Sequence, residues 1–466
     1  MKIVRTIMKW LGIGIGALLV LIILASLIMN VIFGRELRQT MAQLKAEGRA
    51  LTIAEIRPAP IPDDQNAAPL FQKAAELMGS GTYNKPAPKA APSIKELSDL
   101  ISSNNTLDIS TWPTAHREAL PRLIQAPEMI ELFAVLREAA QKPGYNNNLK
   151  YEDGPSMLLP NLGSIRQIAR VLSIKAELDV QAGNGAEAFA TVLEGLKLAD
   201  LLKQEPVLVT QLVRIACDLV MIDRMERMAD ETDIPPDQAR ALIVELAQHT
   251  DATPWVRTMD GERVAMGLWC FQTFQHGSFH DFNSLLDMGM DMHFAPWLGW
   301  GLQYLYMPIL KKDFAVYLTL MSQVQDYYKV PYWKAAETIR NHPTDQQIPR
   351  YCLLTRLLFP NLTAVVTRNT EHDAAIDVAR VGLGLKLFKQ KNGAYPDLLD
   401  KLTPEFLESI PVDPFTGKAL IYRKADAGFM LYSLGPNQQD DNGTPRPTGK
   451  QATGEEPYDI AWKCAR

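Results

Sequence analysis

The chain has 466 residues, with 48 basic and 53 acidic side chains and a formal net charge of -5. This balance lacks the strongly basic character of nucleic-acid-binding proteins, so no nucleic acid is expected among its partners. Hydrophobic residues make up 47% of the chain and charged residues 22%. Such a chain can bury a sizeable core, which excludes global disorder.

The first strong signal is an apolar N-terminal segment. No charged side chain occurs between Trp10 and Gly34, and a helix of that length, at about 1.5 Å per residue, exceeds a hydrocarbon core of roughly 30 Å. The segment therefore predicts a transmembrane helix. A cleavable signal peptide is the alternative, because Lys2, Arg5 and Lys9 form a basic region before it.

The length of the apolar run favours an uncleaved signal anchor. A signal peptide has an apolar region of roughly 7 to 15 residues, and no small-x-small cleavage site follows here. The basic residues on the two flanks give a slight bias to a cytoplasmic N-terminus. We expect a cytoplasmic tip and anchor over residues 1–35, a single pass through a bacterial inner (cytoplasmic) membrane, and a periplasmic location for the bulk of the chain.

A second apolar stretch runs from Phe294 to Leu310. It is interrupted by Pro296, Gln303 and Pro308, which favours a core helix or a surface-lying segment over a second span. As a second span, it would return the C-terminus to the cytoplasm.

The middle of the chain is predicted to be helical. Residues 36–113 read as a helical stalk with proline-rich linkers, and residues 114–371 as an α-helical domain. Apolar residues recur at spacings of three and four from Leu162 to Ala176, and Gly183 to Gly185 break the pattern before a second helix. This helix pair resembles one tetratricopeptide hairpin, but no repeat of about 34 residues follows, so an array is not expected.

The four cysteines are Cys217, Cys270, Cys352 and Cys464. They form no CxxC pair, so neither a structural zinc site nor a thioredoxin-like site is expected. Two disulfides with three alternative pairings would suit an oxidising compartment, and unpaired thiols are the alternative, preferred for at least two of the four.

One group of residues invites a metal-enzyme hypothesis. His276 and His280 are four residues apart and would share a helical face, with Asp281 and His293 nearby. Two imidazoles and a carboxylate could hold zinc. However, Gly277 and Ser278 weaken the required helix, and no glutamate takes the place of a general base. A metal-dependent hydrolase using this region is kept as an alternative function.

No other catalytic pattern is recognised. The sequence contains no GxSxG nucleophile elbow, no phosphate-binding glycine loop, no HExxH and no paired carboxylates at an interpretable spacing. We therefore expect no enzyme and propose no catalytic residue.

The pattern changes at the C-terminal end, over residues 372–466. A helix is predicted from Ala375 to Gln390, ending at Asn392-Gly393 in a left-handed C-cap. Two short strands, 419–423 and 428–433, are then separated by four residues and predict a hairpin. The whole chain thus predicts a mainly α fold with an N-terminal transmembrane helix, an irregular helical domain and a small α+β domain.

Residues 373–462, about one fifth of the chain, carry a recognisable order of motifs. After the helix come Gly393-Ala394-Tyr395-Pro396, Leu399-Asp400-Lys401-Leu402, Pro411 to Lys418, Tyr432 to Gly435 and Asp459-Ile460. This order resembles the periplasmic domain of the major pseudopilins of type II secretion. The whole chain also resembles membrane-anchored bacterial proteins that carry this module behind a helical region.

The resemblance implies a calcium site in the loop after Ser433-Leu434-Gly435. By motif, Asn437 stands where the family usually has an aspartate, Asp440 and Asp441 lie in the loop, and Asp459 matches the late Asp-Ile. Calcium takes six to eight oxygen ligands, to which these side chains could contribute. The loop is longer than in the family, and an ordinary solvated Asp/Asn turn is the alternative.

The position of the module differs from that of a pseudopilin. Over 300 residues separate it from the anchor, and no pilin leader precedes Trp10, so incorporation into a pilus-like fibre is not expected. The sequence predicts a membrane-anchored, periplasm-facing binding or assembly protein with a protein partner. An atypical component of a secretion apparatus is a further alternative.

Overall fold

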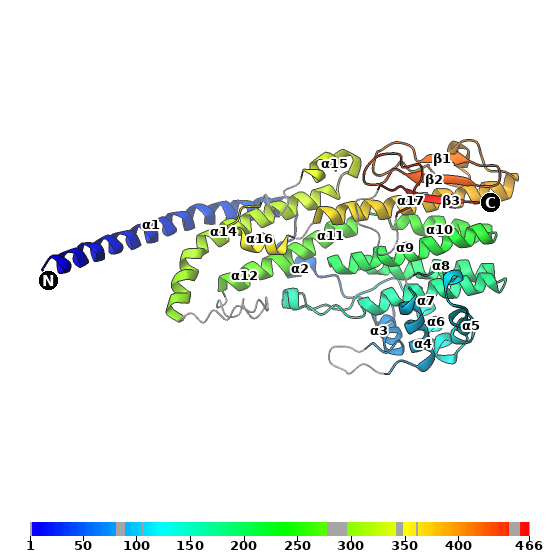
Figure 1. The fold of residues 1–466 in the computed structure, drawn as a ribbon, viewed down its shortest axis with the longest axis horizontal. Coiled ribbons are helices and arrows are strands. Elements are labelled where there is room, and N and C mark those ends of the chain that lie inside the picture. The colour runs from blue at the N-terminus through cyan, green and yellow to red at the C-terminus, as the bar shows by residue number, and fades with distance from the viewer. Residues whose placement is uncertain are drawn as a thin grey trace.

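The computed structural model describes residues 2–80, 89–104, 106–276, 296–341, 348–359, 362–446 and 457–465. It is mainly helical, with a long N-terminal helix at one end and a small sheet at the C-terminal end (Figure 1). This architecture confirms the predicted fold class.

Helix α1 (Lys2–Ala46) is continuous and projects from the body (Figure 1). Its most apolar 18-residue window has a mean hydropathy of 2.8 and is only 6% buried. Within the described part of the chain, α1 is the one helix long and apolar enough to cross a membrane. These features are consistent with a signal anchor or a signal sequence.

Helix α14 (Pro296–Tyr327) lies alongside the C-terminal part of α1 (Figure 1). Lys311 Nζ donates a hydrogen bond to Asn30 Oδ1 at 2.7 Å, and Lys312 Nζ donates one to Glu36 Oε1 at 2.5 Å. Most of the second apolar stretch, from Pro296 to Leu310, therefore belongs to a helix that packs on α1, with Pro308 inside that helix.

A hydrophobic core fastens this end of the body to α1. Leu44 of α1 packs there with Leu310, Phe314 and Leu318 of α14. Three further helices adjoin α14, either directly or through the core: α11 (Thr253–Gly261), α12 (Trp269–His276) and α16 (Leu353–Leu358). A π-helical segment, Glu262–Leu268, connects α11 to α12.

The N-terminal part of the helical domain consists of short helices. They are α2 (Ile53–Ile56), α3 (Ala68–Leu77), α4 (Pro92–Ser103), α5 (Thr114–Ile124) and α6 (Pro127–Ala139), with 3₁₀ turns at Ile109–Thr111 and Tyr151–Ser156. Proline begins or nearly begins several of them, where its missing N–H leaves no bond unmade.

Longer helices form the centre of the body. They are α7 (Leu162–Gln181), α8 (Gly185–Leu201), α9 (Leu208–Glu231) and α10 (Pro236–Gln248), with a 3₁₀ turn at Leu202–Gln204. The predicted break falls between α7 and α8, where Gly183 has a φ of 79°. The apolar stripe of α7 is buried against α8 and α9, as predicted from its spacing.

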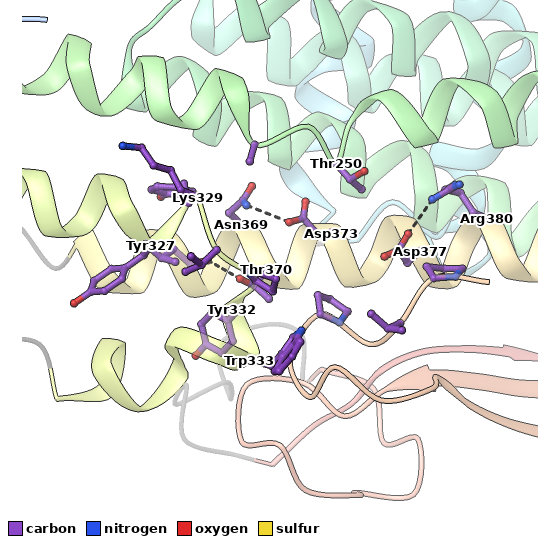
Figure 2. A pocket seen from close by; sticks show the side chains of 18 residues that line it. Thr250, Tyr327, Lys329, Tyr332, Trp333, Asn369, Thr370, Asp373, Asp377 and Arg380 are labelled. Atoms are coloured by element: carbon purple, nitrogen blue, oxygen red, sulfur yellow. Dashed lines mark hydrogen bonds and ion pairs between the residues drawn. The ribbon is translucent and has the colours of Figure 1, made fainter. Parts of the chain in front are cut away.

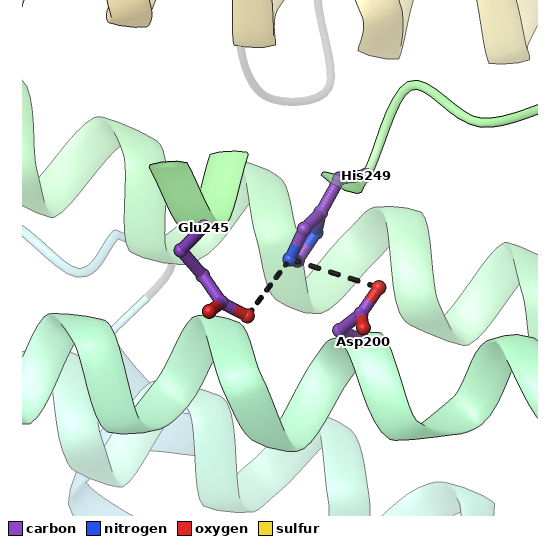
Figure 3. A group of neighbouring side chains, drawn as sticks. All are labelled: Asp200, Glu245 and His249. Carbon is purple, nitrogen blue, oxygen red and sulfur yellow. Dashed lines mark ion pairs between the residues drawn. The ribbon is translucent and has the colours of Figure 1, made fainter. Parts of the chain in front are cut away.

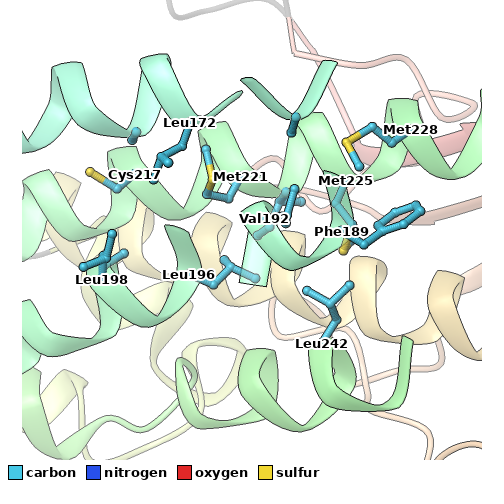
Figure 4. Close-up of a cluster of buried hydrophobic side chains, with 14 of the residues drawn as sticks. Leu172, Phe189, Val192, Leu196, Leu198, Cys217, Met221, Met225, Met228 and Leu242 are labelled. Carbon is cyan, nitrogen blue, oxygen red and sulfur yellow. The ribbon is translucent and has the colours of Figure 1, made fainter. Parts of the chain in front are cut away.

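The largest core lies between these helices (Figure 4). Phe189 and Leu196 of α8 pack there with Met221 and Met225 of α9. Gly195 allows the two helices to approach closely, because a Cβ at this position would lie 2.3 Å from Met221 Sδ. The same core continues into the C-terminal residues, so the two predicted domains share one packed interior.

Helix α17 (Leu362–Asn392) spans this junction. It begins well before the predicted Ala375 and runs through the expected boundary at 371/372. Its first half buries a polar run, Asn369 to His372, that does not look helical in sequence. The helix ends as predicted, with Gly393 at a φ of 81°.

The C-terminal sheet is antiparallel in the order β1-β2-β3. Its strands are β1 (Ile421–Lys424), β2 (Phe429–Ser433) and β3 (Ile460–Cys464), and a 3₁₀ turn at Leu399–Leu402 and helix α15 (Tyr332–Arg340) lie outside it. The predicted hairpin is present, with Ile421 opposite Tyr432. Strand β3 was not predicted, because the segment before it reads as a polar loop.

All four cysteines are free thiols, three of them buried. The preference for unpaired thiols is thus met at every position.

Candidate functional site

A cluster of ionisable side chains lies inside the body, where α8, α9, α10 and α17 meet. Asp218 comes from α9, His249 follows the end of α10, and His372 comes from α17. All three side chains have no solvent exposure. Buried charges are costly unless they are paired. The hydrogen-bond and ion-pair partners of these three side chains are therefore the first question for the site.

Asp218 is the centre of the cluster. Its Oδ2 lies 3.0 Å from His249 Nδ1 and 2.8 Å from His372 Nε2. Burial alone would raise the pKa of Asp218, but the two imidazoles hold it well below its usual range. Its second oxygen, Oδ1, has no hydrogen-bond partner within the described ranges.

The other ring nitrogen of His249 points toward two more carboxylates (Figure 3). His249 Nε2 lies 3.6 Å from Glu245 Oε1 and 3.9 Å from Asp200 Oδ1. Asp200 Oδ2 pairs with Lys203 Nζ at 2.6 Å. Burial alone would lower the pKa of His249, but Asp218 and the neighbouring carboxylates raise it to about 9. Among the described residues, Asp200, Glu245 and His249 form the one group of potential metal ligands whose ligand atoms all lie within 4.8 Å of one another.

Arg214 of α9 completes the cluster. Its Nη1 lies 3.9 Å from Asp200 Oδ1, and the residue is fully buried. None of its guanidinium nitrogens has a hydrogen-bond partner in the part of the chain that the structure describes. The guanidinium acts at a distance, as a fixed positive charge among the carboxylates.

A cleft of about 520 Å³ adjoins this cluster across α17 (Figure 2). The link is Asp373, which lines the cleft and whose Oδ1 is 3.7 Å from His372 Nδ1. Further along the floor, Asp377 Oδ1 accepts a hydrogen bond from Arg380 Nη1 at 3.1 Å. Burial raises the pKa of Asp377 to about 7, against the lowering effect of Arg380. The carboxyl group of Asp377 therefore holds its proton more tightly than that of an exposed aspartate.

The two walls of the cleft come from different parts of the chain. One is the α14–α15 connection, with Tyr327, Val330 and Trp333, and the other is the loop of the C-terminal module at Pro411 to Pro414. Large apolar side chains remain accessible on both walls: Val330 is 45% exposed, Trp333 39% and Val412 53%.

Asp413 fixes the loop that forms the second wall. Its carboxylate accepts hydrogen bonds from Phe415 N at 2.8 Å, Ser433 Oγ at 2.9 Å and Leu434 N at 3.1 Å. The residue is 1% exposed. A buried carboxylate with three donors is stabilising, and it explains how an aspartate between two prolines holds a rigid loop.

Helix α15 packs against the same loop through two of its aromatic residues. The rings of Tyr332 and Phe415 meet edge to face with centroids 5.1 Å apart. Gly417 has a φ of 68°, and a Cβ there would lie 2.6 Å from Trp333 Cε2. The two walls of the cleft therefore contact each other through these residues.

The predicted calcium residues lie together in the loops beside β2 and β3. Asn437 Nδ2 donates to Asp441 Oδ2 at 2.8 Å, and Asp459 Oδ2 accepts from Gly443 N at 2.7 Å. Asp459 Oδ1 is buried and has no hydrogen-bond partner within the described residues. Burial raises the pKa of Asp459, and the charges of Asp441 and Asp440 raise it further.

Both carboxylate oxygens of Asp440 have side-chain partners. Its Oδ1 accepts from Tyr432 Oη at 2.9 Å, and its Oδ2 pairs with Arg423 Nη2 at 3.2 Å. The structure thus gathers the four predicted residues in one region but gives Asp440 a protein cation as a partner.

The residues of the alternative metal site lie mostly outside the described part of the chain. His276 is the last residue of α12, whereas His280, Asp281 and His293 lie outside the described residues.

Sequence reasoning missed the buried cluster. Its members are spread from Asp200 to Asp373 and share no local motif. One signal was available: Asp218 follows Ile215 by three residues and precedes Ile222 by four, so a charged residue interrupts the apolar stripe of a helix.

The chain matches no family model, no curated protein and no solved structure. The resemblance of residues 373–462 to pseudopilins, and the calcium site that it implies, therefore stay predictions.

Proposed function

We propose that the protein is a membrane-anchored, periplasm-facing binding protein that receives a protein partner in the cleft between α15, α17 and the C-terminal module. Helix α1 supplies the anchor by its length and apolarity. The observation that carries the proposal is the pair of accessible apolar walls, with Trp333 and Val412, above a floor of ionisable groups.

The chemistry of the cleft suits a segment of polypeptide. Partly exposed tryptophan is enriched among the residues that dominate protein interfaces, because it buries a large rigid surface at little entropic cost. Asp377 and Arg380 beneath it can orient polar groups of the partner. No group in the cleft is assigned a catalytic role.

The location of the cleft suits a coupling role. Its floor is α17, which packs with α9 and α10 on the helical side and with β2 and β3 on the other. A partner held against both walls therefore contacts the helical domain and the C-terminal module together. This arrangement favours binding or assembly over an isolated stabilising role for the module.

Site-specific photo-cross-linking in intact membranes tests the proposal. A photoreactive amino acid replaces Trp333 in one variant and Leu398, which is 64% exposed outside the cleft lining, in a matched control. We expect a discrete cross-linked adduct at position 333 that is absent at 398. Introducing Val412→Asp on the opposite wall should abolish that adduct, whereas Val244→Asp, on the exposed surface of α10, should not.

The opposite pattern would refute the cleft as a binding site. That pattern is equal cross-linking at the two positions, or an adduct at position 333 that Val412→Asp leaves unchanged.

A further inference from the structure

We propose that Asp200, Glu245 and His249 bind one divalent transition-metal ion of the zinc class. The site lies behind the cleft, within the helical domain, and it goes beyond the proposed binding function. It is also distinct from the His276 region considered from the sequence and from the loop at Asp459.

The spacing of the ligand atoms carries the proposal. Zinc bonds to histidine nitrogen and carboxylate oxygen are about 2.0 to 2.2 Å long, so ligands in a tetrahedral arrangement lie ~3.4 Å apart. The distances from His249 Nε2 to Glu245 Oε1 and Asp200 Oδ1 are 3.6 and 3.9 Å. These separations exceed those of direct hydrogen bonds, about 2.7 to 3.2 Å, and are close to those across a metal ion.

Two of the three facing atoms make no hydrogen bond within the described part of the chain. His249 Nε2 and Asp200 Oδ1 are buried atoms that make no hydrogen bond to any described residue. His249 as a whole is 1% exposed, and its ring is directed between the two carboxylates (Figure 3). Leaving such polar atoms unpaired in an interior is costly, and an ion coordinated by all three side chains would satisfy them.

The second ring nitrogen of His249 is held as in a metal site. Its Nδ1 lies 3.0 Å from Asp218 Oδ2, and the same oxygen receives His372 Nε2 at 2.8 Å. A carboxylate that accepts the Nδ1 proton leaves Nε2 with its lone pair and fixes the orientation of the ring. The residues of this arrangement come from four places: Asp200 from α8, Asp218 from α9, Glu245 and His249 from α10 and its C-terminal end, and His372 from α17.

The charges of the pocket admit a divalent cation. Three carboxylates, Asp200, Asp218 and Glu245, surround His249, and Arg214 is the nearby guanidinium. Lys203 pairs with the outer oxygen of Asp200, and the inner oxygen, Oδ1, lies 3.9 Å from both His249 Nε2 and Arg214 Nη1. Metal binding would replace a proton on His249 Nε2, because the coordinating imidazole must be neutral.

The two carboxylates of the site are not fully buried. The side chains of Asp200 and Glu245 retain 14% and 11% exposure, whereas that of His249 has none. A bound ion would join α8 to the end of α10 and, through Asp218, to α17. We assign it a structural role beneath the cleft.

The test uses the full-length protein in detergent. Its metal content is measured by inductively coupled plasma mass spectrometry, and zinc binding is then titrated after chelation. The decisive variant is Glu245→Gln, which keeps the shape of the side chain and removes the charge. The matched control is Asp237→Asn, because Asp237 lies on the same helix with a fully exposed side chain.

We expect about one equivalent of zinc-class metal in the wild type and in Asp237→Asn. Glu245→Gln should bind zinc at least about tenfold more weakly, a loss typical even of outer-sphere changes. Absence of stoichiometric metal in wild type after both purification and zinc titration would overturn the proposal, as would equal affinity in Glu245→Gln.

Cobalt provides a second readout that needs no variant. Co²⁺ bound by nitrogen and oxygen ligands in a four-coordinate site gives strong visible absorption, which zinc should displace at one equivalent. If Glu245→Gln fails to fold, the same displacement is compared between the wild type and Asp200→Asn, which removes the other carboxylate of the site. A cobalt spectrum identical to that of the hydrated ion would overturn the site.

Discussion

Asp218 of α9 and His372 of α17 are joined by a 2.8 Å hydrogen bond in a part of the interior where neither side chain is exposed. The two residues are 154 positions apart in the sequence. Their contact connects the helical domain to the helix that forms the cleft floor and leads into the C-terminal module. Asp218 therefore adds a buried polar contact to a junction that also shares one hydrophobic core.

Replacing that carboxylate should be strongly destabilising. In Asp218→Asn, His249 and His372 lose their shared charged acceptor, and breaking a buried pair of this kind costs about 3 to 5 kcal/mol. Asp223→Asn on the same helix is the control, because the side chain of Asp223 is 55% exposed. Denaturant unfolding in detergent measures both. Equal midpoints for wild type and Asp218→Asn would refute a structural role for the cluster.

The sheet packs closely on α17 at Gly382, where the ring of Trp462 lies over the helix backbone. A Cβ at Gly382 would lie 2.0 Å from Trp462 Cε3 of β3, so Gly382→Ala must displace the indole or the helix. We expect this overpacking to lower the free energy of unfolding by at least about 2 kcal/mol. Gly163→Ala on α7 is the control: no atom lies within 4 Å of its added Cβ, so it should be neutral or stabilise by up to about 1 kcal/mol. Thermal unfolding that ranks the two variants the other way would contradict this packing.

Glu205, just before α9, should make the stability of the fold depend on pH. Burial raises its pKa from 4.5 to about 7, although Asn147 N donates to its Oε1 at 3.2 Å. The folded state thus holds the proton more tightly than the unfolded chain. The stabilisation from this group is complete below pH 4.5 and is lost as the pH rises through 7.

The variant Glu205→Gln stays neutral at every pH and should remove this dependence. Between pH 5 and 8 the wild type should lose about 2 to 3 kcal/mol of stability relative to the variant. The exposed Glu118→Gln is the control and should follow the wild type. Parallel stability curves for wild type and Glu205→Gln would show that Glu205 is charged in the folded protein at neutral pH.

The calcium prediction has its own thermal test. If the loop of Asn437, Asp440, Asp441 and Asp459 binds the ion only when folded, millimolar calcium should raise the melting temperature, with a stabilisation of about 2.7 kcal/mol at one hundred times Kd. Asp459→Asn should abolish the shift, and Asp426→Asn, exposed in the β1–β2 turn, should retain it. A wild-type melting curve unchanged by calcium or chelator would remove all four residues from the site.

Local patterns account for the parts of the fold that the sequence predicts correctly. An uncharged run identifies α1, spacings of three and four identify α7 to α9, and Gly183 and Gly393 end helices at positive φ. The beginning of α17 is missed for a physical reason. Within its buried polar run Asn369 to His372, Glu371 and His372 pair with Arg446 and Asp218, which are far away in the sequence and cannot be seen from neighbouring residues.

The candidate site is less accessible to prediction. The loop residues Asn437 to Asp459 are close in sequence and carry motifs, so they can be placed together in advance. The cluster around His249 depends on four helices meeting, and the cleft depends on α15 packing against the loop at Phe415. Such contacts are set by tertiary packing, which no local spacing encodes.

In the proposed function, α1 anchors a folded body that presents its cleft outside the cytoplasm. A protease-sensitive tag placed after Arg466 reports this arrangement in intact spheroplasts. We expect digestion of the tag from outside without lysis. Protection of the tag until the membrane is opened would place the C-terminus in the cytoplasm and contradict the proposed location of the cleft and its partner.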